Sequence, residues 1–264
     1  MTTRIGRAFS VRTRPLLVAC LVAGDPDYGE SLAMIREVER AGADIIEVVM
    51  PFSDPVADGP VMQQAIQRAL SAGMNTDALF SLIRDFRSES ETPIVILTYA
   101  NPVVQRGIGA FYRDAGEAGV DGVAVADVPL EEAEPFCMAA RHAGIDPILF
   151  VSQTTSDTRL EGIVERAGGF LYLVAALGVT GVRGEVDPAT IESIRRIKGR
   201  SPLPVVPGFG ISSSYQVQAY SQAGADGVIV GSAIVKEVGD RLGRPGEMRA
   251  AVGEMVRALL AERA

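Results

Sequence analysis

The chain has 264 residues, enough for one large α/β domain or two modest ones. With 47% hydrophobic and 22% charged residues, its composition is that of an ordinary globular protein with a sizeable core. The formal net charge of -8 argues against a nucleic-acid-binding protein, because binding to a polyanion begins with lysine and arginine.

The beginning of the chain, from Met1 to Phe9, lacks the apolar run of a secretion signal. No later stretch reaches the roughly 18 consecutive apolar residues that a transmembrane helix needs, so we expect a cytoplasmic protein. Two cysteines, Cys20 and Cys137, predict no disulfide framework. A single histidine, His142, ends an alanine-rich helical pattern, where we expect it to be exposed, and a metal site is not predicted.

Apolar runs alternate with segments of helical periodicity along the chain. Residues 1–14 have no clear pattern and predict an extension or a short helix lying against the body. Strands are expected over Leu16–Val22, Ile45–Met50, Ile94–Thr98, Gly122–Ala126, Pro147–Val151, Phe170–Val174, Pro204–Val206 and Gly227–Val230. Helices are expected over Ser31–Ala41, Val61–Ala72, Thr76–Arg87, Ile108–Glu117, Leu130–His142, Asp157–Arg166, Pro188–Lys198, Ser213–Gln222 and Glu247–Arg263.

An Ala-Gly-x-Asp sequence recurs at Ala41, Ala118 and Ala223, each time between a predicted helix and a strand. Strands that are apolar throughout are typical of a parallel sheet covered by helices, and eight such units close most economically as a (β/α)8 TIM barrel. We therefore predict a single α/β barrel domain over residues 1–264, with 1–14 as an N-terminal extension. An open doubly wound sheet is the alternative, but the first strand is followed by Gly24-Asp25-Pro26 and not by a dinucleotide-binding glycine motif.

Acidic residues mark the second strand and the loop after it. Glu47 lies within an apolar strand, where burial is expected to raise its pKa, and Asp54 and Asp58 follow on a loop shaped by prolines. Two carboxylates in unlike environments favour general acid and base roles. The structural alternative is a satisfied core glutamate and two loop acids that cap the next helix.

Glycine-bearing loops follow the last three strands, at Gly178–Gly181, Gly208–Ser212 and Gly231–Ile234. In barrels, such loops often bind phosphate through backbone N–H groups and a helix N-terminus. Turn glycines are the alternative, but three consecutive loops of this kind favour a phosphate-bearing substrate, held away from the Glu47 strand.

Four further polar residues follow or occupy strands. Tyr99 and Tyr172 are equally compatible with substrate binding and with core packing. Asp127 is expected to hold a neighbouring loop, and Arg183 to be a solvated charge.

The run from Glu47 through Pro51-Phe52-Ser53-Asp54-Pro55-Val56-Ala57-Asp58-Gly59-Pro60 resembles the signature of the tryptophan synthase α subunit family. The resemblance extends, in the family's order, through further motifs: Gly24-Asp25-Pro26, Tyr99-Ala100-Asn101, Ala126-Asp127-Val128-Pro129, Gly178-Val179-Thr180-Gly181, Gly208-Phe209-Gly210-Ile211-Ser212 and Gly231-Ser232-Ala233-Ile234-Val235. It implies a TIM barrel that cleaves indole-3-glycerol phosphate to indole and glyceraldehyde 3-phosphate, with no cofactor or metal.

The resemblance also implies roles for individual residues. Glu47 would be the acid and base, Asp58 would hold the indole N–H, and Tyr172 would lie beside the substrate. The positions implied for substrate or phosphate binding are Phe209, Gly181, Gly210, Gly231 and Ser232.

A partner is implied as well, a pyridoxal-phosphate β subunit that takes up the indole in an α2β2 complex. Asp54, Asn101 and Thr180 would lie on loops that face this partner, and closure of the loops would make activity depend on it.

Four places differ from the family pattern that the resemblance suggests: Cys20 where an aromatic is common, the bulky Val48–Met50, Ser152-Gln153, and Ala175–Leu177 in place of a Ser-Arg pair. These differences leave a second hypothesis open, a weakly active or inactive paralogue that binds the phosphate ligand and mainly activates a β subunit. A related phosphate-binding isomerase or synthase is less favoured, because no lysine stands at the predicted strand ends.

Overall fold

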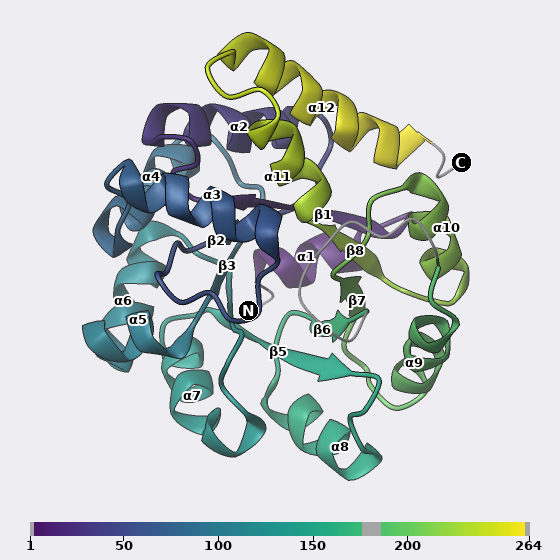
Figure 1. Cartoon of the computed structure of the whole chain (residues 1–264). Coiled ribbons are helices and arrows are strands. Elements are labelled where there is room, and N and C mark those ends of the chain that lie inside the picture. The colour runs from purple at the N-terminus through teal and green to yellow at the C-terminus, as the bar shows by residue number, and fades with distance from the viewer. Residues whose placement is uncertain (1–2, 176–185, 262–264) are drawn as a thin grey trace.

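A computed structural model describes residues 3–175 and 186–261 and forms a barrel of parallel strands surrounded by helices (Figure 1). The strands are β1 (Leu16–Val22), β2 (Ile45–Val49), β3 (Ile94–Thr98), β4 (Gly122–Val125), β5 (Asp146–Ser152), β6 (Leu171–Val174), β7 (Val205–Gly208) and β8 (Gly227–Val230). Each strand pairs with its sequence neighbour from β1 to β7, and β1 also pairs with β8, so the barrel is closed except for the β7–β8 seam. The predicted TIM barrel is confirmed.

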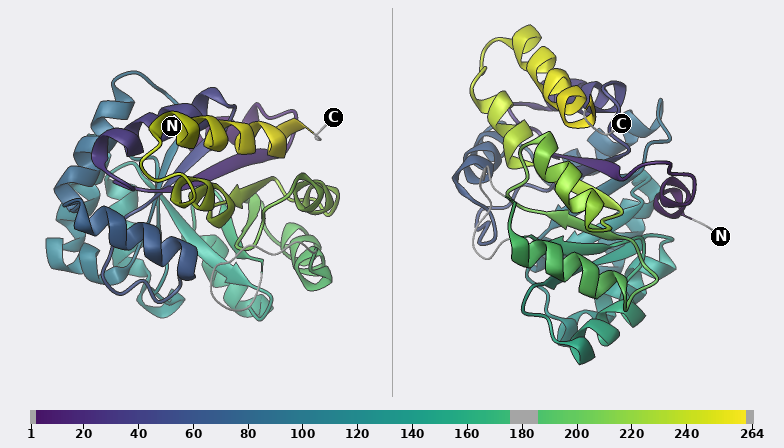
Figure 2. Two further views of the ribbon diagram at one scale, coloured as in Figure 1. Left: turned by 45° about the horizontal axis from the view of Figure 1, so that its top comes forward. Right: turned by 90° about the vertical axis from the view of Figure 1, so that its right-hand side faces the viewer.

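The helices cover the outside of the barrel (Figure 2). They are α1 (Arg4–Ser10), α2 (Tyr28–Arg40), α3 (Pro60–Ser71), α4 (Thr76–Arg87), α5 (Ala100–Arg106), α6 (Ile108–Ala118), η1 (Leu130–Glu132), α7 (Glu134–His142), α8 (Asp157–Arg166), α9 (Pro188–Lys198), α10 (Ser214–Gln222), α11 (Ser232–Gly239) and α12 (Pro245–Ala261). No helix in the described ranges is long and apolar enough to cross a membrane.

Three elements differ from the sequence-based expectation. The helix α5 follows β3 where no helix was expected. Its proline is tolerated because a residue in the first turn of a helix needs no hydrogen-bonded N–H. The short helix α11 was not expected as a separate element. The helix predicted over Leu130–His142 is divided into η1 and α7, and Pro135 stands in the first turn of α7.

The Ala-Gly-x-Asp repeats build the floor of the barrel, at the N-terminal ends of the strands. The aspartate of each repeat accepts a hydrogen bond from the backbone N–H at the start of the preceding strand. These bonds are Leu17 to Asp44 at 2.7 Å, Ile94 to Asp121 at 2.8 Å and Val205 to Asp226 at 2.7 Å. The last of them joins β7 to β8 across the seam that has no strand ladder.

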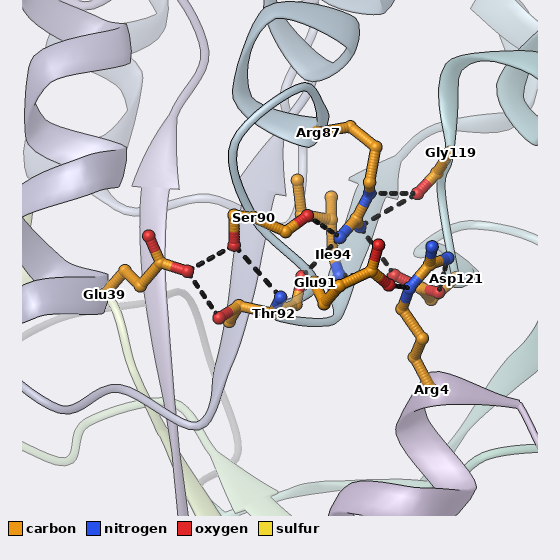
Figure 3. Close-up of polar contacts among 9 residues, drawn as sticks. All are labelled: Arg4, Glu39, Arg87, Ser90, Glu91, Thr92, Ile94, Gly119 and Asp121. Carbon is orange, nitrogen blue, oxygen red and sulfur yellow. Dashed lines mark hydrogen bonds and ion pairs between the residues drawn. The ribbon is translucent and has the colours of Figure 1, made fainter.

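The N-terminal segment lies under this floor, with α1 at one end of the barrel (Figure 2). Its basic side chains neutralise the floor aspartates. The ion pairs are Arg4 with Asp121, Arg14 with Asp44, and Arg12 with Asp226. Figure 3 shows Arg4 and Arg87 meeting at Asp121, beside the loop that carries Glu91. Residues 3–14 of the expected extension therefore form part of the barrel base.

Candidate active site

A narrow pocket with a cavity volume of about 30 Å³ lies inside the barrel, toward the C-terminal ends of the strands. Seven of the predicted site residues line it: Glu47, Asp58, Tyr172, Phe209, Gly210, Gly231 and Ser232. Five apolar or thiol side chains complete the wall: Cys20, Met62, Leu97, Ile211 and Ile229. The sequence analysis assigned no role to Met62, Leu97 or Ile229, which belong to no motif, or to Ile211, which lies in the glycine motif after β7 but carries no polar group.

Glu47 projects into this pocket from the middle of β2 and is completely buried. Neither carboxylate oxygen has a hydrogen-bond partner among the described residues. Burial raises the pKa of Glu47 from 4.5 to about 7, and the nearby charge of Asp58 adds to the rise, while the Cys20 thiol and the Tyr172 hydroxyl oppose it. Near neutral pH the carboxyl group is thus available in both its protonated and ionised forms, as a general acid and base requires.

Asp58 lies on the loop between β2 and α3 and is also buried. The Tyr99 hydroxyl donates a hydrogen bond of 2.6 Å to its Oδ2 atom and accepts one of 3.1 Å from the backbone N–H of Ala57. Burial raises the pKa of Asp58, and the bond from Tyr99 opposes that rise. The N-cap of α3 is Gly59, so the loop acids do not cap this helix.

Aromatic side chains form one wall of the pocket. The Tyr172 ring lies 4.7 Å from that of Phe150 and 5.6 Å from that of Phe209, measured between centroids. A β-carbon at Gly208 would lie 2.6 Å from the Tyr172 ring, so only glycine leaves room for it. Phe209 has a φ of 72°, and no other non-glycine residue in the described ranges has a positive φ. Strained backbone of this kind is concentrated at functional sites.

The opposite end of the pocket is formed by the loops after β7 and β8. Gly231 is the N-cap of α11. The first N–H groups of a helix have no acceptor within it and point beyond its N-terminus, where an anion can bind. Gln216, buried in α10, fixes the other loop by accepting from the Ser212 N–H at 2.9 Å and donating to the Gly210 carbonyl at 3.2 Å. Only β1 separates β8 from the Glu47 strand, so the loop after β8 lies closer to Glu47 than the sequence suggested.

The family model for the tryptophan synthase alpha chain matches residues 8–262. This chain belongs to the tryptophan synthase alpha chain family. The alpha chain of Methanoregula boonei is 47% identical over 248 residues, which cover 94% of each chain. That of Methanothermobacter thermautotrophicus is 48% identical over 244 residues, covering 92% of this chain and 90% of the relative.

Solved structures of the family have the same fold. A chain from the tryptophan synthase α2β2 complex of Pyrococcus furiosus gives a TM-score of 0.87 at 38% identity, covering 93% of this chain and 98% of that one. The alpha subunit of Legionella pneumophila gives 0.87 at 31% identity, covering 98% and 97%.

The remaining positions that the family resemblance singled out lie outside the pocket or outside the described residues. Asp54 is exposed on the loop after β2, and Asn101 is exposed in the first turn of α5, not on a loop as expected. Asp127 accepts a hydrogen bond of 2.7 Å from the Ala100 N–H, which gives it the structural role predicted. Gly181, Thr180 and Arg183 lie outside the described residues, as does the rest of that glycine loop.

Gln153, one of the departures from the family pattern, has a structural role. Its side-chain amide donates to Asp187 at 2.6 Å, and Asp187 caps α9. The Thr190 hydroxyl, which accepts from the same amide at 3.3 Å, also bonds the carbonyl of Ala175. This polar cluster joins the ends of β5 and β6 to α9. Cys20 fills its position on the pocket wall with a small thiol, and Val48 and Met50 are buried.

Charge is sparse in the pocket, where the ionisable groups are Glu47, Asp58, Tyr172 and Cys20. No group of three His, Cys, Asp or Glu side chains that could hold a metal ion occurs within the described ranges. The pocket therefore combines three chemical features. A buried carboxyl group can transfer a proton, a second carboxylate lines the same largely apolar space, and backbone N–H groups can bind an anion.

Proposed function

We propose that this chain is a carbon-carbon lyase, the α subunit of a tryptophan synthase, acting as one barrel domain. Its reaction is the retro-aldol cleavage of indole-3-glycerol phosphate to indole and glyceraldehyde 3-phosphate, a step of tryptophan biosynthesis. The observation that carries the proposal is the buried carboxyl group of Glu47, which faces an apolar pocket without a hydrogen-bond partner among the described residues and has a pKa of about 7.

In this reaction Glu47 donates one proton to the substrate and then accepts one from it. Its protonated form delivers a proton to C3 of the indole ring, which places positive charge on the ring nitrogen. The resulting carboxylate removes the proton of the adjacent glycerol hydroxyl, and that oxygen becomes the carbonyl of glyceraldehyde 3-phosphate as the carbon-carbon bond breaks. The bonding electrons return to the ring, so Glu47 ends protonated as it began.

Asp58 accepts the indole N–H and stabilises the positive charge that develops on the ring. Tyr99 keeps this carboxylate oriented through its 2.6 Å hydrogen bond. Tyr172 and Phe209 contact the aromatic part of the substrate. The phosphate binds to backbone N–H groups at Gly210, Gly231 and Ser232, with Gly181 contributing from the loop after β6.

A β subunit docks on the loop after β2 and on α5, in an α2β2 complex in the cytoplasm. The Pyrococcus furiosus neighbour is described as a mutually activating α2β2 complex. In this chain, Val56 and Val104 are 73% and 53% exposed beside Asp54 and Asn101, an apolar surface suited to a partner. Thr180 belongs to the same proposed interface. This chain needs no cofactor, and pyridoxal phosphate belongs to the β subunit.

The test is indole release from indole-3-glycerol phosphate, measured for the wild type and Glu47→Gln, each with and without a β subunit. Glu47→Gln should lose at least about a hundredfold in kcat, the usual contribution of a general acid or base. Glu165→Gln, which changes an acid whose side chain is 77% exposed on α8, is the matched control. Equal rates for Glu47→Gln and the control would remove Glu47 from the mechanism.

A second candidate function is a binding subunit that holds the phosphate ligand and activates a β subunit with little turnover of its own. The observation favouring it is the small Cys20 side chain on the pocket wall, which offers a substrate ring little contact area. Tight binding of the ligand without indole release, even in the complex, would select this alternative.

A further inference from the structure

Glu47 is surrounded by few groups that can interact with its charge. Asp58 approaches from the loop after β2, Tyr172 from β6 and Cys20 from β1. Its neighbour on β3, Val95, is apolar. Because Asp58 carries the same charge, the donors that favour the ionised Glu47 carboxylate within the described residues are the Cys20 thiol and the Tyr172 hydroxyl, and neither completes a hydrogen bond with it.

Cys20 is placed beside Glu47 by the strand register, which pairs these two residues across β1 and β2. Both side chains line the pocket, so they point to the same side of the sheet. On its other side the thiol packs against the turn that starts α11. A β-carbon added at Gly231 would lie 3.2 Å from both Cβ and Sγ of Cys20, so the glycine leaves the space that the Cys20 side chain needs.

The sulfur stays protonated throughout the working pH range. Burial raises the pKa of the Cys20 thiol well above its usual value, and the charge of Glu47 raises it further. An S–H group is a weak donor, but this one is beside a carboxylate that has no completed hydrogen bond among the described residues. Ionisation of Glu47 gives this donor a charged acceptor.

We propose that Cys20 is a positioning residue whose thiol donates to the ionised Glu47 carboxylate and so sets the pH range in which Glu47 exchanges its proton. The thiol also lies beside the turn at Gly231, between the proposed phosphate cradle and the proposed acid and base. The kinetic part of this inference rests on the proposed function, whereas the titration of Glu47 does not.

The decisive measurement is the titration of the Glu47 carboxyl carbon by 13C NMR, assigned by its loss in Glu47→Gln. Removing the donor in Cys20→Ala should move the midpoint upward by about one pH unit, a roughly tenfold change in the ratio of ionised to protonated form. Cys20→Ser, which keeps a stronger donor, should titrate at or below the wild-type midpoint. Cys137→Ala, which changes the other buried cysteine in α7, should leave the midpoint unchanged.

A midpoint that is the same in Cys20→Ala and the wild type would overturn the proposal, as would equal upward shifts in Cys20→Ala and Cys20→Ser, which would indicate packing alone. If Cys20→Ala fails to fold, the infrared S–H stretching band of wild-type Cys20 replaces it. The frequency of this band should fall as Glu47 ionises and should not change with pH in Glu47→Gln. A frequency that is independent of pH in the wild type would refute the donor role.

The pH dependence of indole release gives the kinetic readout. The limb that reports Glu47 should shift in Cys20→Ala by the same amount as the NMR midpoint. A chain that titrates as expected but releases no indole would refute the proposed reaction and leave the role of Cys20 standing. If the wild type releases indole but the Glu47 midpoint in Cys20→Ala is unshifted, the proposed reaction stands and the role of Cys20 is refuted.

Discussion

Replacing Asp121 with alanine should destabilise the protein strongly, because this floor carboxylate has three partners and is almost fully buried. It accepts from the Ile94 N–H at 2.8 Å, from Arg87 at 2.9 Å and from Arg4 at 3.2 Å (Figure 3). The side chain of Asp121 is 5% exposed and that of Arg87 is 12% exposed. Removal therefore leaves a buried guanidinium group without its charge partner.

The magnitude follows from two losses. Breaking a buried ion pair by removing one partner costs about 3–5 kcal/mol. An unsatisfied buried N–H at Ile94 costs about 1–3 kcal/mol, part of which is already included because the groups share one site. We expect Asp121→Ala to lower the free energy of unfolding by about 4 kcal/mol. Asp121→Asn keeps an oxygen for Ile94 and should lie between Asp121→Ala and the wild type.

Urea titrations followed by circular dichroism and tyrosine fluorescence would measure these differences, since the chain has no tryptophan. Glu91→Gln is the control, because Glu91 bonds the same Arg4 at 2.6 Å from a side chain that is 79% exposed. Its replacement should change stability little. An Asp121→Ala variant as stable as Glu91→Gln would refute the view that burial determines the strength of these floor contacts.

Three further predictions concern the pocket. Tyr99→Phe removes the hydroxyl that bonds Asp58, so the pKa of that aspartate should rise further and kcat/KM for indole release should fall roughly tenfold, the loss of one charge-assisted hydrogen bond. Gly208→Ala places a β-carbon 2.6 Å from the Tyr172 ring, so we expect a higher KM and, from overpacking, a loss of about 1–3 kcal/mol of stability in urea titrations. Glu47→Gln should stabilise the protein increasingly as pH rises. Because the native pKa of about 7 exceeds the ordinary 4.5, the native wild type binds its proton more tightly than the unfolded chain. Wild-type stability therefore falls across that interval by about 3 kcal/mol and stays level above it.

Each of these has a control and a contrary outcome. Tyr215→Phe, at a residue that is 63% exposed, should leave kcat/KM unchanged, and an equal loss in both tyrosine variants would contradict the Asp58 assignment. Gly109→Ala adds a β-carbon in open space on α6 and should be neutral or slightly stabilising. For Glu47→Gln, a stability difference from the wild type that is the same at pH 5 and pH 8 would mean that the glutamate is not buried as described.

The barrel could be predicted from the sequence because local signals agree with it. Strands that are apolar throughout indicate burial on both faces, and several helices begin at a side-chain cap, as at Asp27, Asn75 and Ser156. The α5 and α11 helices escaped detection because they are short, and proline and glycine at their starts read equally well as turns.

Many residues that line the pocket could be predicted from the sequence, but the hydrogen bonds between them could not. Strand ends of a barrel meet at one mouth, which is enough to bring Glu47 together with the glycine loops. The bond from Tyr99 to Asp58 joins residues 41 apart, and Gln216 stands in a helix with no motif, so neither partner is visible without the fold. The functional roles of these residues remain predictions.

Phe209 occupies a backbone conformation that suits glycine, at a cost of about 1–3 kcal/mol for a bulky residue. A glycine there would relax the main chain and at the same time delete the ring that contacts Tyr172. Stability and the proposed contact with an aromatic ligand are therefore opposed at this single position. A variant selected only for heat resistance should readily lose the phenyl group, and with it the contact with the substrate that we propose for Phe209.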